Sequence, residues 1–203
     1  KRSSTPGLSY STWNVEGQLI DKTAISRADH LIHLAGAGVA DKRWTKKRKQ
    51  EIVDSRVMSS RLIVKSLEEV PNKVRSVISA SAIGWYLTPN PSPQGGEGKN
   101  LTPNPSPQSG EGNRLRKFEE TDPAAGDFLG QTCRLWEESI EPVTGFGKRL
   151  VKLRIGIVLS RGGGALKELM KPLRFGIAAI LGSGRQIISW IHINDLVGMF
   201  IAA

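Results

Sequence analysis

Residues 74–86, VRSVISASAIGWY, decide the fold class of this chain. The first six residues predict a buried strand, and a second short strand is predicted over residues 29–34. Between the two strands, Thr45 is a suitable N-cap for a long helix that extends to about Leu67. A strand, a helix and a second strand in this order are typical of a parallel α/β sheet.

The same alternation continues after this unit. We expect a helix over residues 128–140, a strand over 150–159, a loop over 161–164, a helix from 165 that Pro172 ends or kinks, a strand over 187–193 and a last helix from Asn194 or Asp195. The predicted fold class is therefore α/β, with an open, Rossmann-like, doubly wound parallel sheet.

Residues 87–114 interrupt this order with an internal duplication. LTPNPSPQGGEGKN is followed directly by LTPNPSPQSGEGNR, and the copies are identical at 11 of 14 positions. Such Pro/Gly-rich sequence cannot bury enough apolar surface to offset the ordering of the chain. We interpret residues 87–112 as a disordered insertion that resembles translated bacterial intergenic repeats, and a role as a Pro-rich ligand stays open. The insertion separates a region 1–86 from a region 113–203.

Composition restricts the function classes. The 203 residues carry 29 Lys and Arg against 19 Asp and Glu, and 38% of them are hydrophobic. No apolar run is long enough to span a membrane, which needs about 18 residues. The single cysteine, Cys133, excludes an internal disulfide, and the three histidines lack the spacing of a zinc site. We therefore predict a cytoplasmic, metal-free protein.

Positive charge is concentrated in residues 42–49, KRWTKKRK, which hold six of the 29 basic residues. Glu51 and Asp54 follow at once, and Lys47 and Glu51 have the spacing of a helical ion pair. We predict a solvated helix face, with an anionic ligand or partner as the alternative. Specific nucleic-acid recognition is not expected.

Glycine motifs alone do not identify a cofactor. Gly36 and Gly38 follow a predicted strand, as in dinucleotide sites, but Asp41 stands where the third glycine would be. No P-loop, nucleophile elbow or metal motif is present. The residues by themselves indicate an α/β domain with ligand loops at the strand ends.

Several short motifs in order add a family resemblance. They are HLAG at 33–36, RWT at 43–45, SR at 55–56, SASAIGWY at 79–86, FL at 128–129, WE at 136–137, RIGIVL at 154–159, GSG at 182–184 and WIHIND at 190–195. Together they resemble the atypical extended short-chain dehydrogenase/reductases of the nucleoside-diphosphate-sugar epimerase-like group. Because that group starts with a Gly-rich unit and ends with a further domain, the resemblance implies a fragment whose sheet is incomplete at the N-terminus.

The resemblance also implies an NADP site. The residues carried over as cofactor-binding are Arg2, Ala35, Gly36, Ser55, Ser79, Gly156, Val158 and Leu159. Arg2 would meet the 2′-phosphate that distinguishes NADP from NAD. Arg56, beside Ser55, could pair with an anion, although both residues are also explained as ordinary helix-surface residues.

Catalytic residues are carried over only in part. The superfamily's Tyr-x-x-x-Lys pair is absent, since Leu129 and Cys133 occupy its positions. Ser81 matches the superfamily's catalytic serine, which polarises a substrate carbonyl, and Tyr86 is the only phenol nearby in the sequence. We predict Ser81 and Tyr86 as catalytic, with a structural hydroxyl as the alternative for Ser81 and a buried structural thiol as the interpretation of Cys133.

The implied function is that of an NADP-dependent oxidoreductase or epimerase-like protein acting on a small molecule, with a nucleotide sugar as one candidate. Two alternatives stay open: a non-catalytic dinucleotide-binding or sensor protein, and a decayed, inactive fragment. The expected partner is a small-molecule substrate, no membrane or nucleic acid is expected, and a homodimer stays open.

Overall fold

The computed structural model describes residues 7–86, 118–173, 176 and 188–203. The insertion at 87–112 and the cofactor-binding residue Arg2, both predicted above, lie outside the described residues.

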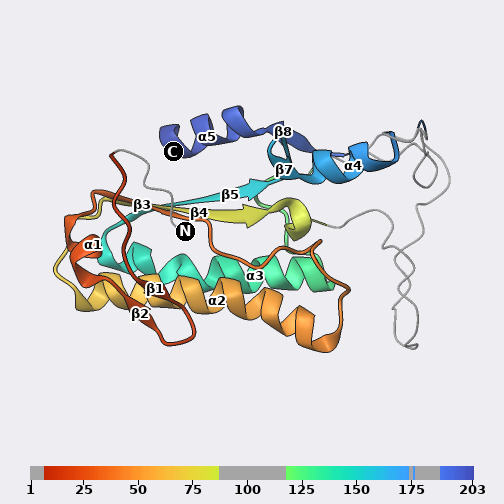
Figure 1. The fold of residues 1–203 in the computed structure, drawn as a ribbon. Helices are drawn as coiled ribbons and strands as arrows, with labels where there is room; N and C mark the ends of the chain where they lie inside the picture. Colours follow the sequence, from red (N-terminus) through yellow and green to blue (C-terminus); the bar gives the residue numbers. More distant parts are fainter. Residues whose placement is uncertain (1–6, 87–117, 174–175, 177–187) are drawn as a thin grey trace.

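A parallel sheet forms the centre of the molecule. It contains β3 (His30–His33), β4 (Ser76–Ala82) and β5 (Arg149–Ile155) in that order, and both pairings are parallel. Helices α2 (Lys46–Glu69) and α3 (Phe128–Ile140) cover one face, and α5 (Ile193–Ala202) covers the other, as Figure 1 shows. The predicted doubly wound α/β fold is confirmed.

The helices begin where the sequence supplies caps. The Thr45 side chain accepts a hydrogen bond from the backbone N–H of Arg48 at 3.2 Å, and α2 starts at the next residue. Asp127 caps α3 in the same way, through the N–H of Gly130 at 2.8 Å. Figure 1 shows that both helices start at the end of the sheet to which the strands point.

Two apolar clusters attach the helices to the sheet. Val77 packs with residues of α2 and α3, including Ile63 and Ile140, and all three are essentially inaccessible. Ile78, the next residue of β4, packs in a second cluster with Phe200 of α5. This alternation follows the two-residue period of a strand whose two faces are both covered.

The predicted strand over 150–159 is wrong as a single element. It is divided at Gly156 into β5 and β6 (Ile157–Ser160), and β6 belongs to a second sheet with β7 (Gly163–Gly164) and β8 (Trp190–His192). A Cβ at Gly156 would lie 2.7 Å from the Ser189 carbonyl oxygen, so this approach of the two backbones requires glycine.

The remaining elements at this end differ little from expectation. The predicted loop 161–164 contains β7, which pairs antiparallel with β6. Helix α4 (Ala165–Leu173) contains Pro172, and the two residues that follow Leu173 lie outside the described part of the chain, so the predicted end or kink at Pro172 stays a prediction. Helix α5 starts at Ile193, capped by His192, one residue before the predicted start.

Three short elements near the N-terminus were not predicted from the sequence. A two-residue hairpin, β1 (Trp13–Asn14) with β2 (Leu19–Ile20), precedes α1 (Lys22–Arg27). The Asp21 side chain caps α1 by accepting from the N–H groups of Thr23 and Ala24. Among the residues that the structure describes, no helix has the length and apolar character needed to cross a membrane.

Candidate functional site

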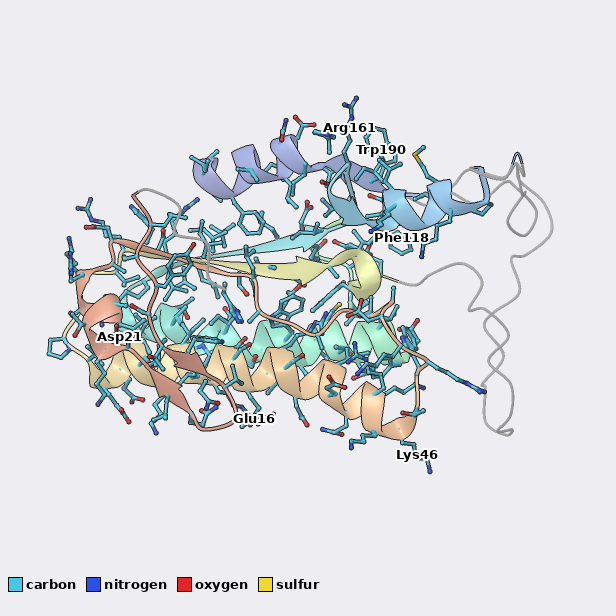
Figure 2. All side chains as sticks on the ribbon, viewed as in Figure 1. Glu16, Asp21, Lys46, Phe118, Arg161 and Trp190 are labelled. Atoms are coloured by element: carbon cyan, nitrogen blue, oxygen red, sulfur yellow. The ribbon has the colours of Figure 1, made fainter. Side chains whose placement is uncertain are left out.

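The candidate site lies where the carboxyl ends of β3, β4 and β5 meet. In open parallel sheets this edge is where ligands bind. The loop after β3, the η1 turn after β4 (Ile83–Trp85) and the start of α2 gather there. Lys46 and Phe118 lie toward this end of the molecule in Figure 2.

The loop after β3 is fixed to α2 by Ser55. Its hydroxyl accepts a hydrogen bond from the Ala37 N–H at 2.9 Å and donates one to the Ile52 carbonyl at 3.0 Å. Gly36 in this loop is exposed, and a Cβ there would lie 3.1 Å from Cζ of Arg56. Ser55 therefore positions the loop that carries Ala35 and Gly36, and direct contact of Ser55 with a cofactor stays a prediction.

A neutral histidine lies directly behind this loop. His33 is buried between Ser59, whose Oγ is 2.9 Å from Nε2, and Ser79, whose Oγ is 3.4 Å from Nδ1. Burial lowers the pKa of His33 to about 4. Ser79 is itself 1% exposed, so its side chain is enclosed in the sheet, and the predicted cofactor contact stays a prediction.

Ser81 is part of a buried ionic network. Its hydroxyl donates to Oε1 of Glu137 at 2.6 Å, and Arg154 holds the same carboxylate through Nε at 2.9 Å and Nη2 at 3.1 Å. Burial opposes the charge of Arg154, but its hydrogen bonds with Glu137 and Tyr86 hold its pKa above the ordinary value. A hydroxyl can donate only one hydrogen bond, and in this arrangement Ser81 donates it to Glu137.

Tyr86 joins the same network from the other side. Nη1 of Arg154 donates to the Tyr86 hydroxyl at 3.0 Å, and the guanidinium carbon lies 3.8 Å from the centre of the Trp85 ring. The structure therefore brings the two predicted catalytic residues, Ser81 and Tyr86, into one hydrogen-bonded chain. Sequence reasoning missed Glu137 and Arg154, the two residues that connect them.

Described residues before and after the insertion contact one another next to Tyr86. The Trp85 indole donates to the Asp122 carbonyl at 2.8 Å, and the Ala125 N–H donates to the Trp85 carbonyl at 2.7 Å. The Tyr86 and Phe118 rings stack with centres 5.1 Å apart. We call these five residues, on both sides of the insertion, the insertion stem.

Arg56 of α2 lies against Trp136 of α3, the residue directly before Glu137. Its guanidinium carbon is 4.9 Å from the centre of the Trp136 ring, and Nη1 donates to the carbonyls of Ala37 and Ile52. Burial lowers the pKa of Arg56. The predicted helix-surface alternative for Arg56 therefore does not hold, since the side chain is partly buried under the Gly36 loop.

Cys133 is confirmed as a buried structural thiol. It is 4% exposed, and its Sγ donates to the Ala82 carbonyl at 3.6 Å. Burial, together with the nearby Glu137 carboxylate, raises the pKa of the Cys133 thiol to about 11. A thiol in this state has little thiolate character and is a poor nucleophile.

Gly156, Val158 and Leu159 belong to the switch between the two sheets. Val158 pairs with Ile191 and Leu159 with His192 in the β6–β8 ladder. The cofactor contacts that the resemblance implies for Gly156, Val158 and Leu159 stay predictions.

Most of the basic run is solvated, as predicted, since Lys42, Arg43, Lys46 and Lys47 are exposed, and Arg48 is the exception. Arg48 is buried and pairs with Glu51 at 2.7 Å, one turn away, and with Asp41 at 3.6 Å. The predicted Lys47–Glu51 pair is replaced because Arg48, not Lys47, lies on the side of α2 that packs inward. Hydrogen bonding from Arg48 lowers the pKa of Glu51.

Relatives of known name share this sequence over most of its length. An epimerase family protein of Mycobacterium bovis is 32% identical over 185 residues, which is 91% of this chain and 53% of that protein. An epimerase family protein of Staphylococcus haemolyticus is 34% identical over 197 residues, which is 97% of this chain and 57% of that protein. The chain thus spans little more than half the length of the curated relatives it matches, and no family profile matches it.

Solved structures show the same architecture. The human epimerase family protein SDR39U1, determined with NADPH, superposes with a TM-score of 0.68 at 26% identity over 86% of this chain and 52% of that one. A nucleoside-diphosphate sugar epimerase from Corynebacterium glutamicum superposes with a TM-score of 0.70 at 26% identity. The match covers 100% of this chain and 36% of that one.

Proposed function

Because the chain belongs to the epimerase-like branch of the extended short-chain dehydrogenase/reductases, we propose that it serves an NADP-dependent oxidoreductase or epimerase-like activity on a small molecule. The observation that carries this proposal is the arrangement at the sheet edge. An exposed Gly36 loop, suited to a dinucleotide, and the Tyr86 phenol both lie where parallel strands end.

The residues present fit one side of a dinucleotide. Gly36 lets the backbone approach a ligand closely, and Ser55 keeps the loop in place from behind. Ala35 and Gly36 would contact the adenosine side of the cofactor. NADP is proposed over NAD because the human relative was determined with NADPH and because Arg2 supplies a cation for a 2′-phosphate. When bound, the cofactor supplies or accepts a hydride.

Proton transfer is assigned to Tyr86. Its hydroxyl is held by Arg154 at 3.0 Å, and stacking on Phe118 fixes the plane of its ring. The Ser81 hydroxyl uses its single hydrogen to donate to Glu137, so its oxygen can only accept a further hydrogen bond in this arrangement. We therefore give Tyr86 the proton-transferring role and Ser81 a place in the network that orients Arg154.

The second candidate function is non-catalytic dinucleotide binding. It is favoured by the Ser81 proton, which is directed to Glu137 rather than to a substrate, and by the Leu129 and Cys133 side chains at the superfamily's Tyr and Lys positions. Such a protein would sense the cofactor without turning over a substrate.

Calorimetric titration with NADPH and with NADH tests the cofactor proposal. We expect NADPH to bind more tightly, and equal affinity or tighter NADH binding contradicts it. A screen of carbonyl compounds and nucleotide sugars with NADPH then separates the two functions.

On any substrate turned over, Tyr86→Phe should lower kcat about 100-fold, because it removes a general acid–base group. Tyr10→Phe is the matched control, since Tyr10 and Tyr86 are the only two tyrosines in the chain. Turnover that survives Tyr86→Phe removes Tyr86 from the chemistry, and cofactor binding without any turnover favours the sensor function.

A further inference from the structure

Three arginines point inward near the candidate site, and they differ in their partners. Arg48 pairs with Glu51 at 2.7 Å, and Arg154 pairs with Glu137 at 2.9 Å. Arg56 forms no ion pair with any residue in the described part of the chain; its hydrogen bonds there both leave from Nη1 and end on backbone carbonyls. Within the described residues, Arg56 is therefore a partly buried cation without a counter-charge.

The groups around Arg56 do not supply that counter-charge. Burial lowers its pKa, the Cys133 thiol raises it, and the Arg48 cation lowers it further. Cys133 is not an anion at neutral pH, since its own pKa is raised to about 11. Burying a charge without a partner is unfavourable, so proteins keep such groups mainly where a ligand completes them.

A polar group next to Arg56 lacks a described hydrogen-bond acceptor. The indole nitrogen Nε1 of Trp136, the ring that lies against Arg56, is buried and has no hydrogen-bond partner among the described residues. An indole N–H can only donate. Beside the exposed Gly36 loop, the cluster thus contains a cation without a described counter-charge and an N–H donor without a described acceptor.

We propose that Arg56 is a binding residue for a phosphate group at this sheet edge, with Trp136 as the surface on which its guanidinium is oriented. A planar guanidinium presents paired donors that match a phosphate, and its Nε and Nη2 are not used by the described residues. Gly36 adjoins this site, because a Cβ there would lie 3.1 Å from Cζ of Arg56 and would press on its side chain. The assignment rests on the proposed function for the source of the phosphate, which is either the dinucleotide or a nucleotide-sugar substrate.

The experiment compares Arg56→Met and Arg56→Lys with the matched control Arg61→Met, an exposed arginine on the same helix. Binding of NADPH and of UDP-glucose is measured by calorimetry, and the thermal shift with inorganic pyrophosphate is measured in parallel. We expect Arg56→Met to weaken binding about 10- to 100-fold, Arg56→Lys to weaken it less, and Arg61→Met to leave it unchanged.

The separate titrations with NADPH and with UDP-glucose identify the source of the phosphate. A loss confined to NADPH assigns Arg56 to the cofactor, and a loss confined to UDP-glucose assigns it to the substrate. A structural role would instead lower the Tm of the ligand-free protein without changing affinity, and that result overturns the proposal. Should Arg56→Met not fold, Arg56→Lys gives the same comparison.

Failure of this proposal is distinguishable from failure of the proposed function. If the wild type binds NADPH and UDP-glucose and the Arg56 variants bind both equally well, Arg56 is not a phosphate-binding residue and the function stands. The wild type could bind neither nucleotide while pyrophosphate raises the Tm of the wild type but not that of Arg56→Met. That result supports the phosphate site and contradicts the proposed function. A wild type that responds to none of the three ligands overturns both.

Discussion

Two neighbouring clusters at α3 contain buried charge in different states. In the first, the Glu137 carboxylate and the Arg154 guanidinium neutralise each other and hold Ser81 and Tyr86. In the second, Arg56 has no carboxylate partner among the described residues, and burial lowers the pKa of the nearby His33 so that it is neutral at pH 7. The first cluster can stabilise the fold by itself, whereas the second is where we propose that a ligand supplies the missing negative charge.

The largest expected effect comes from breaking the ion pair of the first cluster. Glu137→Ala leaves Arg154 without its carboxylate and Ser81 without its acceptor, and we expect a loss of about 3–5 kcal/mol in the free energy of unfolding. Urea denaturation measures it. Glu138→Ala is the matched control, because Glu138 pairs with Arg134 on the surface of the same helix, and such pairs contribute about 0.2–1 kcal/mol. Equal losses for the two variants would show that the Glu137 pair is no more than a surface contact.

The neutral histidine gives a pH dependence of intermediate size. His33 has a pKa of about 4 in the folded protein against 6.5 when unfolded, so the unfolded chain binds more protons between these values. The contribution of His33 to the free energy of unfolding is fully present above pH 6.5 and is lost as the pH falls toward 4. Between pH 7 and pH 5 the wild type should lose about 2 kcal/mol more than His33→Gln, measured by urea denaturation at both pH values. Identical pH slopes for the two proteins would contradict a buried, neutral His33.

Deleting the insertion should have the smallest effect. All the stem contacts, including Trp85 to Asp122 and Tyr86 to Phe118, come from residues outside 87–112. Deleting residues 87–111 joins Tyr86 to Gly112 and shortens the connection roughly fourfold, which should raise stability by about 1 kcal/mol through the smaller entropy of loop closure. Thermal unfolding of the deletion variant checks this. A clear fall in Tm would show that the insertion packs against the fold.

Local patterns predicted most of the architecture. Helix α3 has the bounds expected from its periodicity, and α2 starts directly after the predicted cap, Thr45. The division of the 150–159 segment was missed because its apolar run continues through Gly156, and only the distant Ser189 reveals the change of sheet. The β1–β2 hairpin was missed because strands of two residues show no periodicity.

The candidate site was predictable only in part. Ser81 and Tyr86 were named from a motif, but the link between them joins α3 to β5 and appears only when the two elements pack together. One signal was present: Glu137 stands among Cys133, Trp136 and Ile140, the apolar positions that α3 buries. A carboxylate on a buried helix face requires a buried partner.

The insertion stem also has a consequence for the order in which the chain folds. Ala125 and Trp85 are joined by a backbone hydrogen bond across the stretch that contains the insertion, whereas β3 and β4 pair across a stretch that consists mostly of the α2 helix. A helix is built from local contacts and shortens the loop that must close, whereas a connection without such contacts must close before the contact at its ends stabilises anything. We expect the β3–α2–β4 unit to condense first and the stem to close late. The geometry around Tyr86 would then be among the last parts of the fold to form and among the first to be lost on unfolding.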